Sequence, residues 1–69
     1  MLLHENLKKF REEKGMSCDM VARLSGVNYS TYTKIDSGEI RSPRVHTVYM
    51  IAKALGVTIE DLIGEESLS

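Results

Sequence analysis

The apolar residues of this 69-residue chain recur at helical spacing. Leu3, Leu7 and Phe10 lie four and three residues apart, which places them on one face of a helix. Further along, Val48 and Ile51 repeat the spacing within an apolar stripe that continues to residue 55. The pattern therefore predicts an all-α protein built from short amphipathic helices packed into one domain over residues 1–69.

Glycines and capping residues mark the expected helix ends. Each of the five glycines follows an apolar-periodic segment, where a left-handed residue commonly ends a helix. Ser17 is a good N-cap, Thr58 with Asp61 resembles a capping box, and Pro43 suits the first turn of a helix. We expect helices at about 3–14, 18–24, 29–37, 44–55 and 59–63, a core of about 3–64, and a frayed acidic tail at 65–69.

Residues 21–38 contain the most informative pattern. Val21 lies on the apolar face of a short helix, Gly26 reverses the chain, and Asn28 can cap a second helix that buries Tyr32 and Ile35. This is the layout of a helix-turn-helix, whose second helix presents a polar face to the DNA major groove. That polar face comprises Tyr29, Ser30, Thr31, Thr33 and Lys34.

Composition and charge narrow the function classes. A single cysteine excludes an internal disulfide framework and suits the reducing cytoplasm, and no apolar run approaches the roughly 20 residues that span a bilayer. The N-terminus has no long apolar segment of the kind found in secretion signals. The net charge is −1, but residues 1–53 hold nine basic and six acidic side chains, a local +3. Local positive charge is what DNA binding needs, because charges are screened beyond about 8–10 Å.

Several short motifs arrive in an order that resembles a known family. The chain is similar to the Cro/lambda-repressor type of helix-turn-helix protein, also called the XRE family, over about residues 3–64. The motifs that carry the resemblance are Leu7-x2-Phe10-Arg11-x3-Gly15, Val21-Ala22-x3-Gly26-Val27-Asn28, Ile35-Asp36-x-Gly38 and Ile51-Ala52-x-Ala54-Leu55-Gly56-Val57. The resemblance implies a compact five-helix lambda-repressor-like DNA-binding domain that usually acts as a dimer on a palindromic operator.

The resemblance also implies which residues contact bases. The base-contacting positions of the family fall on Tyr29, Ser30 and Lys34, with Thr33 beside them. Lys34 can donate to guanine O6 and N7 or to a phosphate, and Ser30 can contact either kind of base. The alternative is that these are ordinary solvated residues of an exposed helix.

Phosphate contacts are expected around this helix. Ser17, Cys18 and Asn28 lie where helix N-termini favour an anion, and Arg41 and Arg44 lie in a segment that the family lays against the DNA backbone. The alternative for the arginines is simple surface solubility.

Two residues depart from the family pattern. Cys18 stands where the family commonly has a DNA-contacting Gln, and Arg44 stands where a small polar residue is frequent. Since a thiol is a poor donor, the contact at Cys18 is weakened or passes to backbone N–H groups, whereas Arg44 could add a phosphate contact. A thiol at a helix N-terminus is also expected to have a lowered pKa and to oxidise readily, although an inert side chain is the better interpretation.

Arg11 and Asp36 are positions that the family often pairs across its first and third helices. We expect a partly buried bidentate ion pair that fixes the angle of the helix at 29–37 and is structural rather than a DNA contact.

The C-terminal part has more apolar residues than a small core needs. A homodimer surface is expected there, formed by Ile59, Leu62, Ile63 and Leu68.

Catalysis and cofactors have little support. His4 and His46 are isolated from ligand-type neighbours, and neither a catalytic triad nor a glycine-rich phosphate loop is evident. We expect no enzyme, no metal, no cofactor, no small-molecule ligand and no membrane association.

The leading interpretation is a bacterial or phage transcriptional regulator, a repressor acting in the cytoplasm as a homodimer on double-stranded operator DNA. The alternative is a protein-interaction module, such as an antitoxin or adaptor, with little intrinsic DNA specificity. A third interpretation, the DNA-binding end of a longer repressor, is weaker because Met1 and the Glu/Ser-rich end look like a complete small protein.

Overall fold

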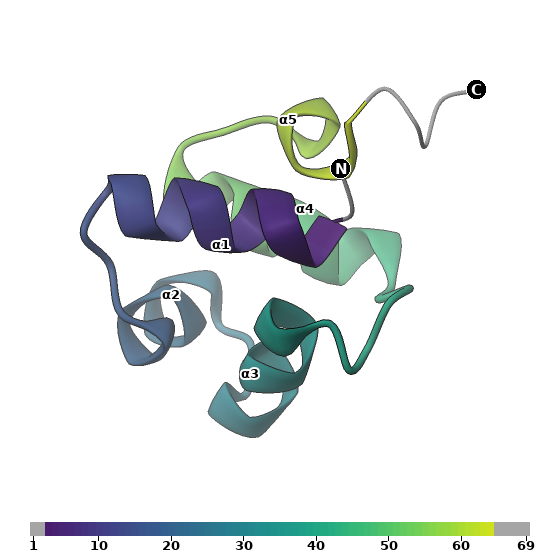
Figure 1. Cartoon of the computed structure of the whole chain (residues 1–69). Coiled ribbons are helices and arrows are strands. Elements are labelled where there is room, and N and C mark those ends of the chain that lie inside the picture. The colour runs from purple at the N-terminus through teal and green to yellow at the C-terminus, as the bar shows by residue number, and fades with distance from the viewer. Residues whose placement is uncertain (1–2, 65–69) are drawn as a thin grey trace.

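A computed structural model describes residues 3–64 and places five helices within that range (Figure 1). The all-α, five-helix prediction is confirmed. The helices are α1 (Leu3–Glu13), α2 (Cys18–Ser25), α3 (Tyr29–Ser37), α4 (Val45–Leu55) and α5 (Ile59–Ile63).

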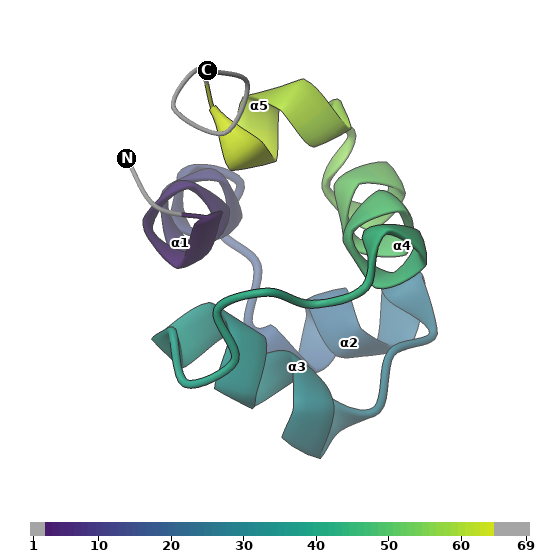
Figure 2. The same cartoon turned by 90° about the vertical axis from the view of Figure 1, so that its right-hand side faces the viewer.

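The helices surround one interior. Figure 2 shows α1 and α4 on opposite sides, α5 across one end and the α2–α3 pair across the other. The contacts agree: α2 packs on α3 and α4, α1 packs on α3 and α5, and α4 packs on α5. The α2–α3 pair therefore presents an outer surface at one end of the molecule, away from α5.

Apolar side chains from every helix fill this interior. Val48, Ile51 and Leu55 of α4 are buried as predicted, whereas Leu3 and Phe10 of α1 are partly buried against the core. The most deeply buried large side chains are Leu7, Val21, Tyr32, Ile35, Ile51, Leu55 and Leu62. The helical spacing in the sequence thus identified most of the core.

Leu62 corrects one prediction. It was expected on a dimer surface, but it is only 1% exposed because α5 packs on α1 and α4 and inserts this side chain between them. Asn6 Nδ2 donates to the Leu62 carbonyl at 2.8 Å, which ties α1 to the same turn of α5. Leu62 is a core residue. Leu68 of the same predicted surface lies outside the described residues.

Side-chain caps start the short helices as expected. Ser17 Oγ accepts the Met20 N–H at 3.1 Å at the start of α2. At α5 both hydrogen bonds of the Thr58–Asp61 capping box are formed, each at 3.0 Å. The start of α4 differs from the expectation, because Arg44 is its N-cap and Pro43 precedes the cap instead of lying in the first turn.

Glycine is required where α3 ends. Gly38 has a φ of +89°, and a Cβ atom built on it would lie 2.9 Å from the His4 ring of α1. Any larger residue would be strained in this conformation and would displace the histidine. The first turn of α1 thus covers the end of α3.

None of the described helices has the length and apolar character needed to cross a membrane.

Candidate DNA interface

Two buried residues fix which face of α3 points outward. Tyr32 and Ile35 are fully buried, as the spacing predicted, and pack into the core beneath the helix. The Asn28 side chain caps α3 by accepting the N–H groups of Ser30 and Thr31 at 2.9 and 3.4 Å. The helix therefore starts at a defined residue and has a defined rotation about its axis.

The predicted base-contacting residues share the opposite face. Tyr29, Ser30 and Lys34 are exposed, and Thr33 is partly buried. Thr33 Oγ1 donates to the Ser30 carbonyl at 2.9 Å, so its hydroxyl is partly used within the helix. Because residues three and four apart are neighbours on a helix, the four side chains form one continuous surface. We call this surface the α3 face.

The predicted phosphate-binding residues lie at the starts of α2 and α3 and in the segment between α3 and α4. In that segment Arg44 lines a hollow with Thr31 of α3, whereas Arg41 lines a hollow with Leu3 and Ile63. Ser17 and Asn28 are exposed at the starts of α2 and α3, where backbone N–H groups favour an anion. Arg41 and Arg44 are exposed in the segment between α3 and α4. Within residues 3–64 neither arginine forms a side-chain hydrogen bond or ion pair, so both guanidinium groups are available to an anionic ligand.

The Arg11–Asp36 ion pair expected from the resemblance is formed. Arg11 Nε donates to Asp36 Oδ1 at 3.0 Å and Arg11 Nη2 donates to Oδ2 at 3.2 Å, a bidentate arrangement. Arg11 Nη1 also donates to the Met16 carbonyl at 3.0 Å, which holds the α1–α2 connection. The hydrogen bond to Asp36 raises the pKa of Arg11.

Two further donors meet the same carboxylate. Tyr32 Oη donates to Asp36 Oδ1 at 3.2 Å, and Cys18 Sγ donates to Oδ2 at 3.7 Å. We call these four side chains, Arg11, Cys18, Tyr32 and Asp36, the Asp36 junction. The pKa of Tyr32 is raised well above its ordinary value, by burial first and then by the Asp36 charge.

Cys18 behaves differently from the sequence expectation. Burial, and then the Asp36 charge, raise the pKa of its thiol, so the lowered pKa predicted from its place at a helix N-terminus is wrong. Its side chain points to the Asp36 junction. A phosphate contact at this position would therefore come from the backbone N–H group rather than from the thiol.

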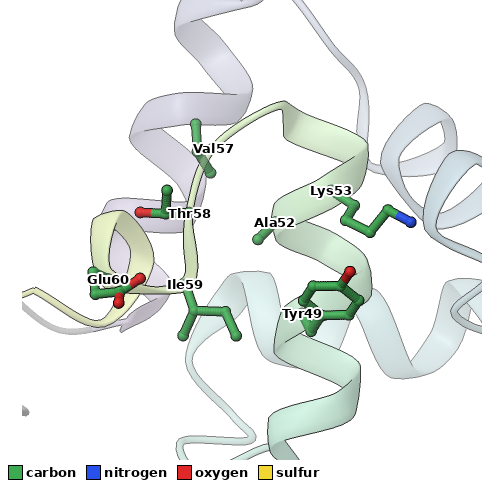
Figure 3. Close-up of a pocket in the computed structure, with 7 residues that line it drawn as sticks. All are labelled: Tyr49, Ala52, Lys53, Val57, Thr58, Ile59 and Glu60. Atoms are coloured by element: carbon green, nitrogen blue, oxygen red, sulfur yellow. The ribbon is translucent and has the colours of Figure 1, made fainter.

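An apolar surface lies on α4 and α5. Sequence reasoning predicted its α5 residues, Ile59 and Ile63, but missed Val45 and Tyr49 of α4. Val45 is 73% exposed and Tyr49 is 47% exposed, both on the outer side of α4. Tyr49 and Lys53 of α4 line one hollow with Ile59 and Glu60 of α5, and Figure 3 shows that the Lys53 side chain extends away from α5. The Lys53 ammonium lies 5.6 Å from the centre of the Tyr49 ring. The position of Tyr49, just outside the apolar stripe of α4, is the feature of the sequence that could have indicated this surface.

A second hollow continues this surface past Ile59. It is lined by Val45, Ile59 and Ile63 together with Leu3 and Pro43. Ile59 and Ile63, two of the predicted dimer residues, are partly buried here. We call the combined surface of Val45, Tyr49, Lys53, Ile59, Glu60 and Ile63 the α4–α5 face.

Comparison with known proteins now identifies the fold. A family model described as "Helix-turn-helix" matches residues 7–62. The chain belongs to the Cro/lambda-repressor type helix-turn-helix family. This is a family of DNA-binding transcriptional regulators. The chain is also 34% identical over 62 residues to the "Uncharacterized HTH-type transcriptional regulator y4dJ" of Sinorhizobium fredii, an alignment that covers 90% of this chain and 79% of that protein.

Membership in the helix-turn-helix family assigns α2 and α3 to the motif itself. Gly26, with a φ of +77°, forms the turn between them and donates its N–H to the Ala22 carbonyl at 3.0 Å. Such a tight turn places α3 at a fixed angle to α2.

Proposed function

We propose that this helix-turn-helix protein is a transcriptional repressor that binds operator DNA in the cytoplasm as a homodimer, with α3 in the major groove. The observation that carries the proposal is the α3 face, a polar helical surface backed by the buried Tyr32 and Ile35. A helix of this kind can enter the major groove without withdrawing apolar side chains from the core.

Each residue of the α3 face offers a contact suited to the groove. Lys34 can donate to guanine O6 and N7, Ser30 can contact either kind of base, and Tyr29 can pack on a thymine methyl or reach a phosphate. A good base contact discriminates by about 1–3 kcal/mol. Lys34 is therefore the residue whose loss tests sequence preference most directly.

Phosphate contacts from Arg41 and Arg44 would orient the protein on the duplex. Both guanidinium groups are exposed and have no side-chain partner within residues 3–64, and Arg44 lines a hollow with Thr31 and Ile35 of α3. Because each cation that neutralises a phosphate releases condensed counterions, it steepens the log–log salt dependence by about 0.9.

The experiment begins by selecting bound fragments of genomic DNA and measuring affinity for a selected fragment and for random duplex. Lys34→Ala should reduce the preference for the selected fragment about tenfold while leaving the affinity for random DNA nearly unchanged. Arg44→Ala should weaken binding to both DNAs alike and lower the salt slope by about 1.

Two results would contradict the proposal. One is parental behaviour of both variants, which would show that the α3 face does not contact DNA. The other is binding to random duplex that does not depend on salt concentration.

The homodimer would form through the α4–α5 face. A two-fold axis there would pair apolar residues with their own copies, and Lys53 of one subunit could meet Glu60 of the other. Palindromic half-sites require the two α3 helices to lie about 34 Å apart, one turn of the duplex.

Sedimentation equilibrium tests the dimer. Tyr49→Asp should convert the protein to a monomer, because it places a charge in the apolar contact. Leu24→Asp is a matched control, since Leu24 is 63% exposed on α2, outside the α4–α5 face. A parent protein that is monomeric at the concentrations where it binds DNA would contradict a homodimer.

A protein-interaction module is the second candidate function, and the exposed apolar residues of the α4–α5 face favour it. In that case the face would bind a different protein, and binding to duplex DNA would be weak and insensitive to the Lys34 and Arg44 substitutions.

A further inference from the structure

Cys18 occupies the first residue of α2, but its side chain points toward the end of α3. The thiol is partly buried and lies 3.7 Å from Asp36 Oδ2. We propose that Cys18 is a positioning residue of the DNA interface, whose thiol holds α2 to the end of α3 through Asp36 and so sets the direction in which the α3 face meets DNA.

The distribution of donors around Asp36 gives Cys18 this role. Arg11 binds both carboxylate oxygens from α1, and Tyr32 binds one from within α3. Among the described residues, Cys18 is the donor that α2 contributes. Without it, the polar bonds would fix α3 to α1, whereas α2 would be held to α3 by the turn and by apolar contacts, which carry little directional preference.

The thiol can donate throughout the neutral pH range. Burial and the Asp36 charge raise the pKa of Cys18, which keeps its proton in place. Hydrogen bonds to an ionised acceptor are stronger than neutral ones, and this one lies in a partly buried site. A weak donor in such a place can still bias the orientation of two short helices.

Orientation matters here because the junction and the α3 face share one short helix. Lys34 is two residues from Asp36, so a small rotation of α3 moves the end of its side chain relative to a base edge. Recognition requires side chains held within about 0.5 Å and 10–20° of the productive geometry. Loss of the Cys18 bond should therefore affect sequence discrimination more than binding to DNA in general.

The test compares Cys18→Ala, which removes the donor, with Cys18→Ser, which keeps one. The measured quantity is the ratio of affinities for a selected genomic fragment and for random duplex at fixed salt. Cys18→Ala should lower this ratio about three- to tenfold, which lies within the net contribution of an ordinary intramolecular hydrogen bond, because a thiol is a weak donor. Cys18→Ser should restore the ratio to within about twofold of the parent value, because its hydroxyl is the stronger donor.

A matched control separates positioning from simple destabilisation. Lys9→Gly lowers the melting temperature through the poor helix propensity of glycine in the exposed middle of α1. It should leave the affinity ratio unchanged, because the loss of the Lys9 positive charge weakens the attraction to both DNAs equally. An unchanged ratio in Cys18→Ala, or an equal loss in the alanine and serine variants, would overturn the proposal.

The inference rests on the proposed function, so one readout is taken without DNA. Backbone amide chemical shifts along Ser30–Lys34 should move in Cys18→Ala and return in Cys18→Ser. If the parent protein binds no DNA, the proposed function fails while these shifts still decide whether Cys18 orients α3. Unmoved shifts in Cys18→Ala would overturn the positioning role by themselves.

Discussion

The two short helices α3 and α5 are held in place by different means. Both start at a side-chain cap, Asn28 for α3 and the Thr58 capping box for α5. Beneath α3, apolar burial is joined by the Asp36 junction, with four hydrogen bonds from three side chains to one carboxylate. Beneath α5 the anchor is Leu62, whose carbonyl accepts a hydrogen bond from Asn6 Nδ2.

The outer faces of α3 and α5 also differ in polarity. The outer side of α3 is polar, whereas α5 contributes the partly buried Ile59 and Ile63 to an apolar surface. Directional bonds suit a helix whose side chains must meet hydrogen-bonding groups at set angles. Apolar packing suffices for a helix that adds to a hydrophobic contact. The α3 end and the α5 end of this fold should therefore tolerate different substitutions.

The largest expected effect comes from breaking the junction under α3. Asp36→Ala leaves the Arg11 guanidinium and the Tyr32 hydroxyl partly or fully buried without their acceptor, so the free energy of unfolding should fall by about 3–5 kcal/mol. Replacing both charges together, in Arg11→Met with Asp36→Leu, should cost less because no uncompensated charge remains. Urea unfolding followed by circular dichroism measures both. A double variant less stable than Asp36→Ala would show that the junction itself stabilises the fold.

A smaller effect compares the two caps. Asn28→Ala and Thr58→Ala should each lower the free energy of unfolding by about 1 kcal/mol, since each removes a side-chain acceptor from a helix N-terminus. Asn28→Gly should cost only a few tenths of a kcal/mol. Hydrogen exchange should show the added opening confined to α3 in one variant and to α5 in the other. Global opening in both would mean that the two helices unfold as one unit.

The smallest effect is a loss of stability at alkaline pH that arises at the Asp36 junction. The folded protein raises the pKa of Cys18 and of Tyr32, so as the pH rises the unfolded chain releases these protons first. This stability is fully present below about pH 8.5, the ordinary thiol value, and is lost above it, with a further loss above about pH 10. Urea midpoints measured from pH 7.5 to 10.5 follow the decline, and Cys18→Ser should abolish its first part. An unchanged decline in that variant would assign it to other groups.

Much of the fold could be predicted from the sequence because its signals are local. Tyr32 and Ile35 were placed inward by helical spacing, and the capping box at Thr58 by residue types three apart. The Arg11–Asp36 pair came from the family resemblance and is present. DNA contacts at the α3 face remain predictions, although the exposure of Tyr29, Ser30 and Lys34 that they require is observed.

The errors fall where the answer depends on tertiary packing. In a helix of only five residues, spacing places Ile59, Leu62 and Ile63 on one apolar side but does not tell which of them enters the core. The pKa of Cys18 is raised first by burial and then by the charge of a carboxylate 18 residues away, and neither can be inferred from the local sequence. The exposure of Tyr49 likewise depends on how α5 crosses α4.

The contact between Gly38 and the His4 ring has a consequence for retargeting this protein to new DNA sequences. A combinatorial library that varies Tyr29, Ser30, Thr33 and Lys34 keeps the contact between the His4 ring of α1 and Gly38 at the end of α3. Its members would therefore share one backbone structure. Randomising Gly38 would instead introduce side chains that collide with the His4 ring and displace it from the end of α3. The useful diversity of such a library therefore lies in Tyr29, Ser30, Thr33 and Lys34, and not in the buried Tyr32 between them.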